Sequence, residues 1–102
     1  MAIIDEIREI FVRSEFVLSR HATDQAILRN IYMQEVSEAI RSGELIEDYP
    51  DDKYGPSCLI LGFTKGGRPL HIQCTYPQSS GVRIVTLYEP NFEDWIDYRI
   101  RR

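Results

Sequence analysis

The stretch SCLILGFTKGGRPLHIQCTY, residues 57–76, places an apolar run and an alternating polar–apolar run on either side of a glycine pair. Both runs are typical of β-strands. Gly66 and Gly67 favour a two-residue turn in which both residues have positive φ. The stretch therefore predicts an antiparallel hairpin in which Lys65 pairs with Arg68.

This register decides which face of the sheet each side chain occupies. It sets Gly62 opposite His71, and the polarity of the following run sets His71 opposite Tyr88 and Gln73 opposite Thr86. His71 then lies on the more polar face, where it is either an ordinary solvated residue or a functional one. The predicted apolar face consists of Leu59, Leu61, Phe63, Leu70, Ile72, Cys74, Val85 and Leu87.

Helical spacing of apolar residues occurs before this stretch and not after it. It predicts helices over residues 2–13, 20–29 and 33–43, the second capped by Ser19 and ended by Asn30. Strands are predicted over residues 44–49, 57–65, 68–76 and 82–89, and residues 15–19 are predicted as an extended link. We expect one domain over residues 1–102: an α+β fold whose N-terminal helices pack on one face of a four-stranded antiparallel sheet, with a short C-terminal helix from Pro90.

The composition narrows the classes of function. The chain has 102 residues, a net charge of −4 and a pI near 5.1, which argues against a broad basic surface for nucleic acid. No apolar run approaches the roughly 20 residues of a membrane span, and the acidic N-terminus does not resemble a signal peptide. We therefore expect a cytoplasmic protein that does not bind membranes. Cys58 and Cys74 are expected to remain thiols on opposite faces of the sheet, and no metal or cofactor is expected.

A polar stripe lies on the second predicted helix. His21, Gln25 and Arg29 are four residues apart, so they share one helix face about two turns long. The residue types allow two interpretations, a solvated helix face or part of a site. Histidine can transfer protons and arginine can bind phosphate, so the second interpretation requires that tertiary packing bring this stripe close to His71.

Four segments of the chain resemble a bacterial family known only as a domain of unknown function. They are SRHATDQAILRNI…VSEAI, GELIEDYPDDKYGPSCLILGF, GRPLHI and TLYEPNFEDW…RIRR, and they run in order over residues 17–102. That family is similar to the BrnT and MqsR branch of the RelE/ParE toxins. The resemblance implies the toxin of a type II toxin–antitoxin pair. Such a toxin would be a metal-independent endoribonuclease that acts on RNA or the ribosome, neutralised by a cognate antitoxin such as a zinc-finger protein of the MqsA type.

The resemblance also implies roles for individual residues. Cleavage of RNA by its own 2′-hydroxyl needs a base, an acid and a cation at the phosphoryl oxygens. The candidates for these catalytic roles are His21, Arg29, His71 and Tyr88. The candidates for RNA contacts are Arg68, Gln73, Arg83, Arg99 and Arg101.

The acidic charge and one departure from the family pattern favour an alternative. Many relatives carry an Arg-Met pair where this chain has Gln25 and Ala26, so one phosphate-binding candidate is missing. The alternative is a non-catalytic binding module of the same fold. Such a module would hold a protein or peptide partner, or inhibit a target such as gyrase by binding, and its oligomeric state is open between a monomer and a homodimer.

Overall fold

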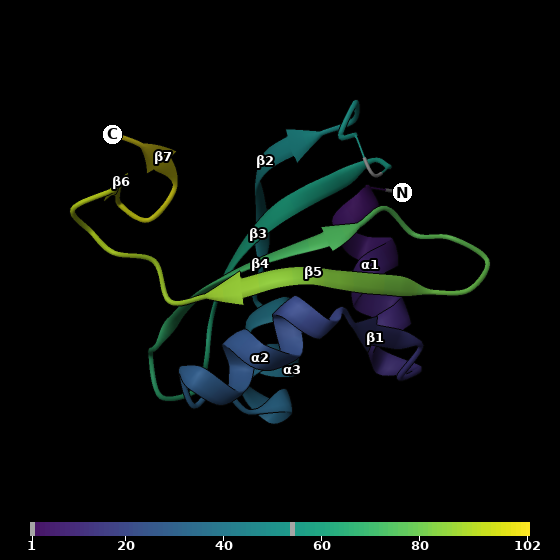
Figure 1. The fold of residues 1–102 in the computed structure, drawn as a ribbon, viewed down its shortest axis with the longest axis horizontal. Helices are drawn as coiled ribbons and strands as arrows, with labels where there is room; N and C mark the ends of the chain where they lie inside the picture. The colour runs from purple at the N-terminus through teal and green to yellow at the C-terminus, as the bar shows by residue number, and fades with distance from the viewer. Residues whose placement is uncertain (1, 54) are drawn as a thin grey trace.

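The computed structural model describes residues 2–53 and 55–102 (Figure 1). Over these residues it contains three α-helices: α1 (Ile3–Val12), α2 (Arg20–Leu28) and α3 (Met33–Arg41). The main sheet contains β1 (Phe16–Leu18), β2 (Glu44–Tyr49), β3 (Ser57–Phe63), β4 (Pro69–Thr75) and β5 (Val82–Tyr88). A small second sheet contains β6 (Trp95–Ile96) and β7 (Ile100–Arg101). The predicted N-terminal helices and β2 to β5 are confirmed, with ends that differ by at most two residues. Among the described residues, no helix is long and apolar enough to cross a membrane.

Local hydrogen bonds explain where α2 begins and ends. Ser19 is its N-cap, and its Oγ accepts a hydrogen bond from the backbone N–H of Ala22 at 3.0 Å. The same hydroxyl donates to the backbone carbonyl of Val85 at 2.8 Å. After the helix, Asn30 takes a left-handed φ of 54°, as predicted for the residue that ends it. The cap of α2 therefore also fixes the helix against β5.

The main sheet is mixed and has five strands in the order β1-β5-β4-β3-β2, which corrects the predicted four-stranded antiparallel sheet. The additional strand is β1, which pairs with β5 in parallel and sets Val17 beside Arg83. Sequence patterning misses β1 because three residues are too few to show a period of two. The helices cover one face of this sheet, with α2 packed on β5 and α3 on β3 (Figure 1).

The C-terminal segment is a second departure from the prediction. Over residues 90–102 the chain forms the β6–β7 pair, and no helix is present in this segment. The turn between the two strands has positive φ at Asp97 (53°) and Tyr98 (61°), a geometry for which Asn-Gly is normally favoured. Trp95, only 4% exposed, anchors the pair to the main sheet. The predicted C-terminal helix is wrong because this tertiary anchoring outweighs the weak helix signal of Pro90.

The turn between β3 and β4 is longer by one residue than Gly66-Gly67 suggests. The Thr64 N–H donates to the Arg68 carbonyl at 3.0 Å, so the loop has three residues, and only the second glycine of the pair, Gly67, has positive φ (87°). A three-residue loop ending in a left-handed glycine is the next most common hairpin turn after the two-residue type. The pairing is shifted accordingly, and Leu61 rather than Gly62 lies opposite His71.

The shift turns the side chains of β3 over relative to the prediction. Ile60 and Cys58 face the helices and belong to the core, whereas Leu59 and Leu61 lie on the other face, although both are almost fully buried. Cys58 lies directly opposite Cys74, which corrects the expectation that the two lie on opposite faces. Both are buried free thiols.

The pairing of β4 with β5 agrees with the prediction around the histidine. His71 lies opposite Tyr88, as expected. Further along, a bulge sets Ile84 rather than Val85 opposite Cys74. The bulge leaves Val85 half-buried on the strand that α2 contacts, while Ile84 joins the core.

Candidate functional site

His71 is buried on the sheet face opposite to the helices. Its side chain is fully buried, and its Nδ1 is 3.1 Å from the hydroxyl of Tyr88. Its Nε2 is 2.6 Å from the backbone carbonyl oxygen of Tyr98. A carbonyl can only accept, so Nε2 donates to Tyr98. In the neutral imidazole Nδ1 then accepts the hydroxyl proton of Tyr88, so both ring nitrogens have a partner.

The surroundings of His71 favour its neutral form. Burial lowers the pKa of the imidazole, and the hydrogen bond to the Tyr98 carbonyl only partly opposes this effect. Burial likewise raises the pKa of Tyr88. The indole of Trp95 packs edge-on against the imidazole, with ring centroids 4.4 Å apart. The expectation that His71 lies on a wetter face is wrong, because residues distant in sequence cover it.

Residues 90–102, here called the C-terminal cover, bury His71. Ion pairs with glutamates of β2 hold this segment in place. The Arg101 guanidinium lies 4.7 Å from the Trp95 ring centroid and pairs with Glu47 at 3.0 Å. Arg99 pairs with Glu44. Burial alone would raise the pKa of Glu47, but hydrogen bonds from Tyr49 and Arg101 lower it overall. Two of the arginines predicted to contact RNA are therefore engaged with carboxylates.

The predicted stripe on α2 is present but lies away from His71. Arg29 Nε donates to Gln25 Oε1 at 2.8 Å, and His21 is exposed on the same helix. α2 packs on the core face of the sheet, whereas His71 points to the other face. His21 and His71 therefore lie on opposite sides of the sheet and do not meet.

A cleft does form beside Arg29, and we call it the Arg29 cleft. It has a volume of about 540 Å³ and is lined by Arg29, Arg68, Pro69, Glu89, Pro90, Asn91, Phe92 and Tyr98. Arg68 connects three of its lining segments: Nε pairs with Glu89 at 2.6 Å, and Nη2 donates to the Arg29 carbonyl at 2.8 Å. The hydrogen bond with Glu89 raises the pKa of Arg68. Arg68 therefore joins β4 and β5 to the end of α2.

Three groups in the Arg29 cleft are free to meet a ligand. Among the described residues, the terminal guanidinium nitrogens of Arg29 and the hydroxyl of Tyr98 have no hydrogen-bond partner. The ring of Phe92 is 67% exposed. Together with the carboxylate of Glu89, these groups combine a cation, a proton donor, a proton acceptor and an aromatic surface.

Sequence reasoning identified Arg29 and Arg68 but missed the other residues of the cleft. Glu89 could have been found, because the correctly predicted pairing of His71 with Tyr88 places it near the start of β4. Phe92 and Tyr98 could not, since they belong to the C-terminal cover, whose path has no periodic signal.

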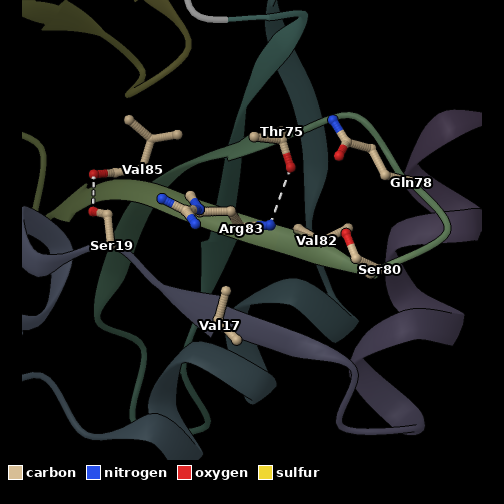
Figure 2. Close-up of a pocket in the computed structure, with 9 residues that line it drawn as sticks. Val17, Ser19, Thr75, Gln78, Ser80, Val82, Arg83 and Val85 are labelled. Carbon is tan, nitrogen blue, oxygen red and sulfur yellow. Dashed lines mark hydrogen bonds between the residues drawn. The ribbon is translucent and has the colours of Figure 1, made fainter.

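The remaining predicted RNA contacts lie elsewhere. Gln73 is turned inward, and its amide donates to the Ser57 hydroxyl at 3.2 Å. Arg83 lies in a second hollow, here called the Arg83 pocket, which Figure 2 shows on the sheet between β1 and the β4–β5 loop. Over the part of the chain that the structure describes, no group of three or more His, Cys, Asp or Glu side chains could hold a metal ion.

The chain belongs to a family described as a domain of unknown function (DUF4258), whose model matches residues 18–89. This agrees with the resemblance to an uncharacterised family, and nothing in the match ties the chain to the BrnT and MqsR toxins. The match includes Arg29, Arg68, Glu89 and His71 but ends before the C-terminal cover. No curated protein and no solved structure matches the chain.

Proposed function

We propose that this protein is the toxin of a type II toxin–antitoxin pair and acts as a metal-independent endoribonuclease, with its RNA bound in the Arg29 cleft. The observation that supports this proposal is the convergence in one open cleft of Arg29, Glu89 and Tyr98 beside the exposed ring of Phe92. The proposed RNA site is therefore the Arg29 cleft, and it does not include the buried His71.

The residue types in the cleft match the chemistry of RNA cleavage. The Glu89 carboxylate, oriented by Arg68, would accept the proton of the attacking 2′-hydroxyl. The free guanidinium nitrogens of Arg29 would stabilise the charge on the phosphoryl oxygens. The Tyr98 hydroxyl would donate a proton to the leaving 5′-oxygen. A base stacked on Phe92 would hold the strand in place, as aromatic platforms do for single-stranded RNA.

A second candidate is the non-catalytic binding module of the same fold. The observation that favours it is the charge balance of the cleft, where Arg68 already pairs with Glu89 at 2.6 Å and Glu35 at 3.4 Å. Only Arg29 then offers an unpaired cation in this cleft among the described residues. Such a site would bind a partner without providing the electrostatic stabilisation that catalysis needs.

One pair of experiments separates the two candidates. Induction in a bacterial host should stop growth, and co-expression of the neighbouring gene, the expected antitoxin, should restore it. Purified protein should cleave RNA in EDTA and leave a 2′,3′-cyclic phosphate. Glu89→Gln should abolish cleavage, whereas Glu93→Gln, which alters an exposed carboxylate on the C-terminal cover, should not. Growth arrest without cleavage would favour the binding module, and healthy growth at high levels of soluble protein would overturn the toxin proposal.

A further inference from the structure

We propose that the Arg83 pocket is a second binding site, which takes a small molecule carrying an oxyanion, either a phosphate or a carboxylate, next to an apolar group. The pocket has a volume of about 660 Å³. It shares no lining residue with the Arg29 cleft. The proposal is therefore independent of the proposed endoribonuclease site.

The cation of this pocket is available for a ligand. Arg83 is exposed, and no described residue pairs with its guanidinium. Its backbone is fixed on both sides, because its N–H donates to Thr75 Oγ1 at 3.0 Å and Val17 of β1 lies beside it. Figure 2 shows the Arg83 side chain running along β5, with Val17 on one side and Thr75 on the other. An arginine presented in this way can bind an oxyanion through two parallel hydrogen bonds.

One rim of the pocket is preformed by the β4–β5 loop. Gly81 has a φ of 103°, and a Cβ there would lie 2.0 Å from the Glu15 carbonyl oxygen, so only glycine allows this close approach. The backbone groups of Gln78 and Gly81 bond to each other at 3.0 and 2.9 Å. These contacts hold Gln78 and Ser80 at the pocket, where their polar side chains have no partner among the described residues.

The apolar lining indicates what accompanies the oxyanion. Val17 is 58% exposed, and Val82 and Val85 line the pocket with it. Ligand pockets of about 300 to 1,000 Å³ typically combine such apolar walls with a few polar groups that orient the ligand. A nucleic-acid strand would need several phosphate contacts to bind firmly, whereas this pocket has one arginine. A small organic anion fits both features better.

The test is a titration of the full-length protein followed by the NMR signals of its backbone amides. Phenyl phosphate and benzoate are the probes, since they distinguish phosphate from carboxylate recognition, and phenol is the neutral control. We expect saturable shifts at Thr75, Gln78 and Arg83 with at least one anion, and none with phenol. Arg83→Gln should weaken binding about tenfold or more, as expected for loss of a charged hydrogen bond. Arg41→Gln, which removes another exposed arginine without a described partner, should leave binding unchanged.

Three results would overturn the proposal. The first is the absence of saturable shifts with either anion. The second is equal affinity in the wild type and Arg83→Gln. The third is a response confined to an RNA oligonucleotide and weakened by Arg83→Gln, which would make the pocket part of an RNA surface. RNA cleavage measured in the same variant reports separately on the endoribonuclease proposal, because Arg83 lies outside the Arg29 cleft.

Discussion

At the scale of single residues, His71 shows how burial changes the meaning of a sequence signal. Leu70 and Ile72 face the core, so the side chain of His71 between them points to the other face of the sheet. Its pairing with Tyr88 could be predicted from polarity. Its burial could not, because the residues that bury it, Trp95 and Tyr98, come from a segment without a periodic pattern. What looks like an exposed catalytic group in the sequence is an anchoring point for the C-terminal cover.

The pH dependence of stability should report this burial. Burial lowers the pKa of His71 in the folded protein, whereas the unfolded chain titrates near 6.5. The unfolded state therefore binds the proton more readily, so this contribution to stability is complete above a pH of about 6.5 and falls as the pH drops from there towards the folded-state pKa, below which it stays lost. The melting temperature should therefore begin to decline below a pH of about 6.5, where most carboxylates are still ionised.

His71→Gln should remove this part of the decline, and the exposed His21→Gln should retain it. The melting temperature of both variants, measured across the same pH range, provides the comparison. An equal slope in His71→Gln and the wild type would show that the decline has another origin, such as Glu47 in the pair with Arg101.

At the scale of elements, the close contact between β3 and α3 depends on Gly62, which has no side chain. A Cβ on Gly62 would lie 1.8 Å from the Ala39 carbonyl oxygen and 2.8 Å from its Cα, so the helix backbone would have to move. Gly62→Ala should therefore destabilise the fold by about 1–3 kcal/mol, the usual cost of overpacking, or more. Gly66→Ala is the matched control, because its nearest atom is 3.7 Å away and its φ is not positive. Its effect should lie within about 0.5 kcal/mol.

Denaturant unfolding of both variants measures these differences. Similar midpoints for Gly62→Ala and Gly66→Ala would mean that α3 can move away from the sheet at little cost. This would contradict the close packing of the two elements.

The elements also show which parts of the fold can be predicted from the sequence and which cannot. The helices and β2 to β5 could be predicted because caps, turns and apolar spacing mark them within two residues. The β3–β4 register could not, since Gly66-Gly67 is compatible with both a two-residue and a three-residue loop, and the choice turns over every side chain of β3. β1 and the β6–β7 pair are too short for any period and depend on tertiary contacts. The Arg29 cleft could therefore be predicted only in part: Arg29 and Arg68, next to the ends of α2 and β4, were identified, whereas Phe92 and Tyr98 were not.

At the scale of the whole molecule, the sheet is covered by helices on one face and by residues 90–102 on part of the other (Figure 1). The two layers differ in how much they contribute to the stability of the fold. The helices bury a continuous apolar core, whereas β6 and β7 contribute two residues each and are marginal without their anchors. The cover is held mainly by Trp95 on His71 and by ion pairs at the surface, which typically contribute little.

We therefore expect the C-terminal cover to detach before the rest of the molecule unfolds. Trp95 is the single tryptophan of the chain, so its fluorescence reports on the cover alone, whereas far-ultraviolet circular dichroism reports on the helices and the main sheet. In a urea titration the fluorescence transition should come first, and two transitions that do not coincide indicate an intermediate.

Arg101→Gln removes the cation over the Trp95 ring and the pair with Glu47, and should lower the fluorescence midpoint while leaving the dichroism midpoint nearly unchanged. Arg41→Gln should change neither midpoint, because α3 lies on the other face. Coincident transitions in the wild type and in Arg101→Gln would show that the cover and the main sheet unfold as one unit, with the contacts of His71 to Trp95 and Tyr98 strong enough to hold the cover in place.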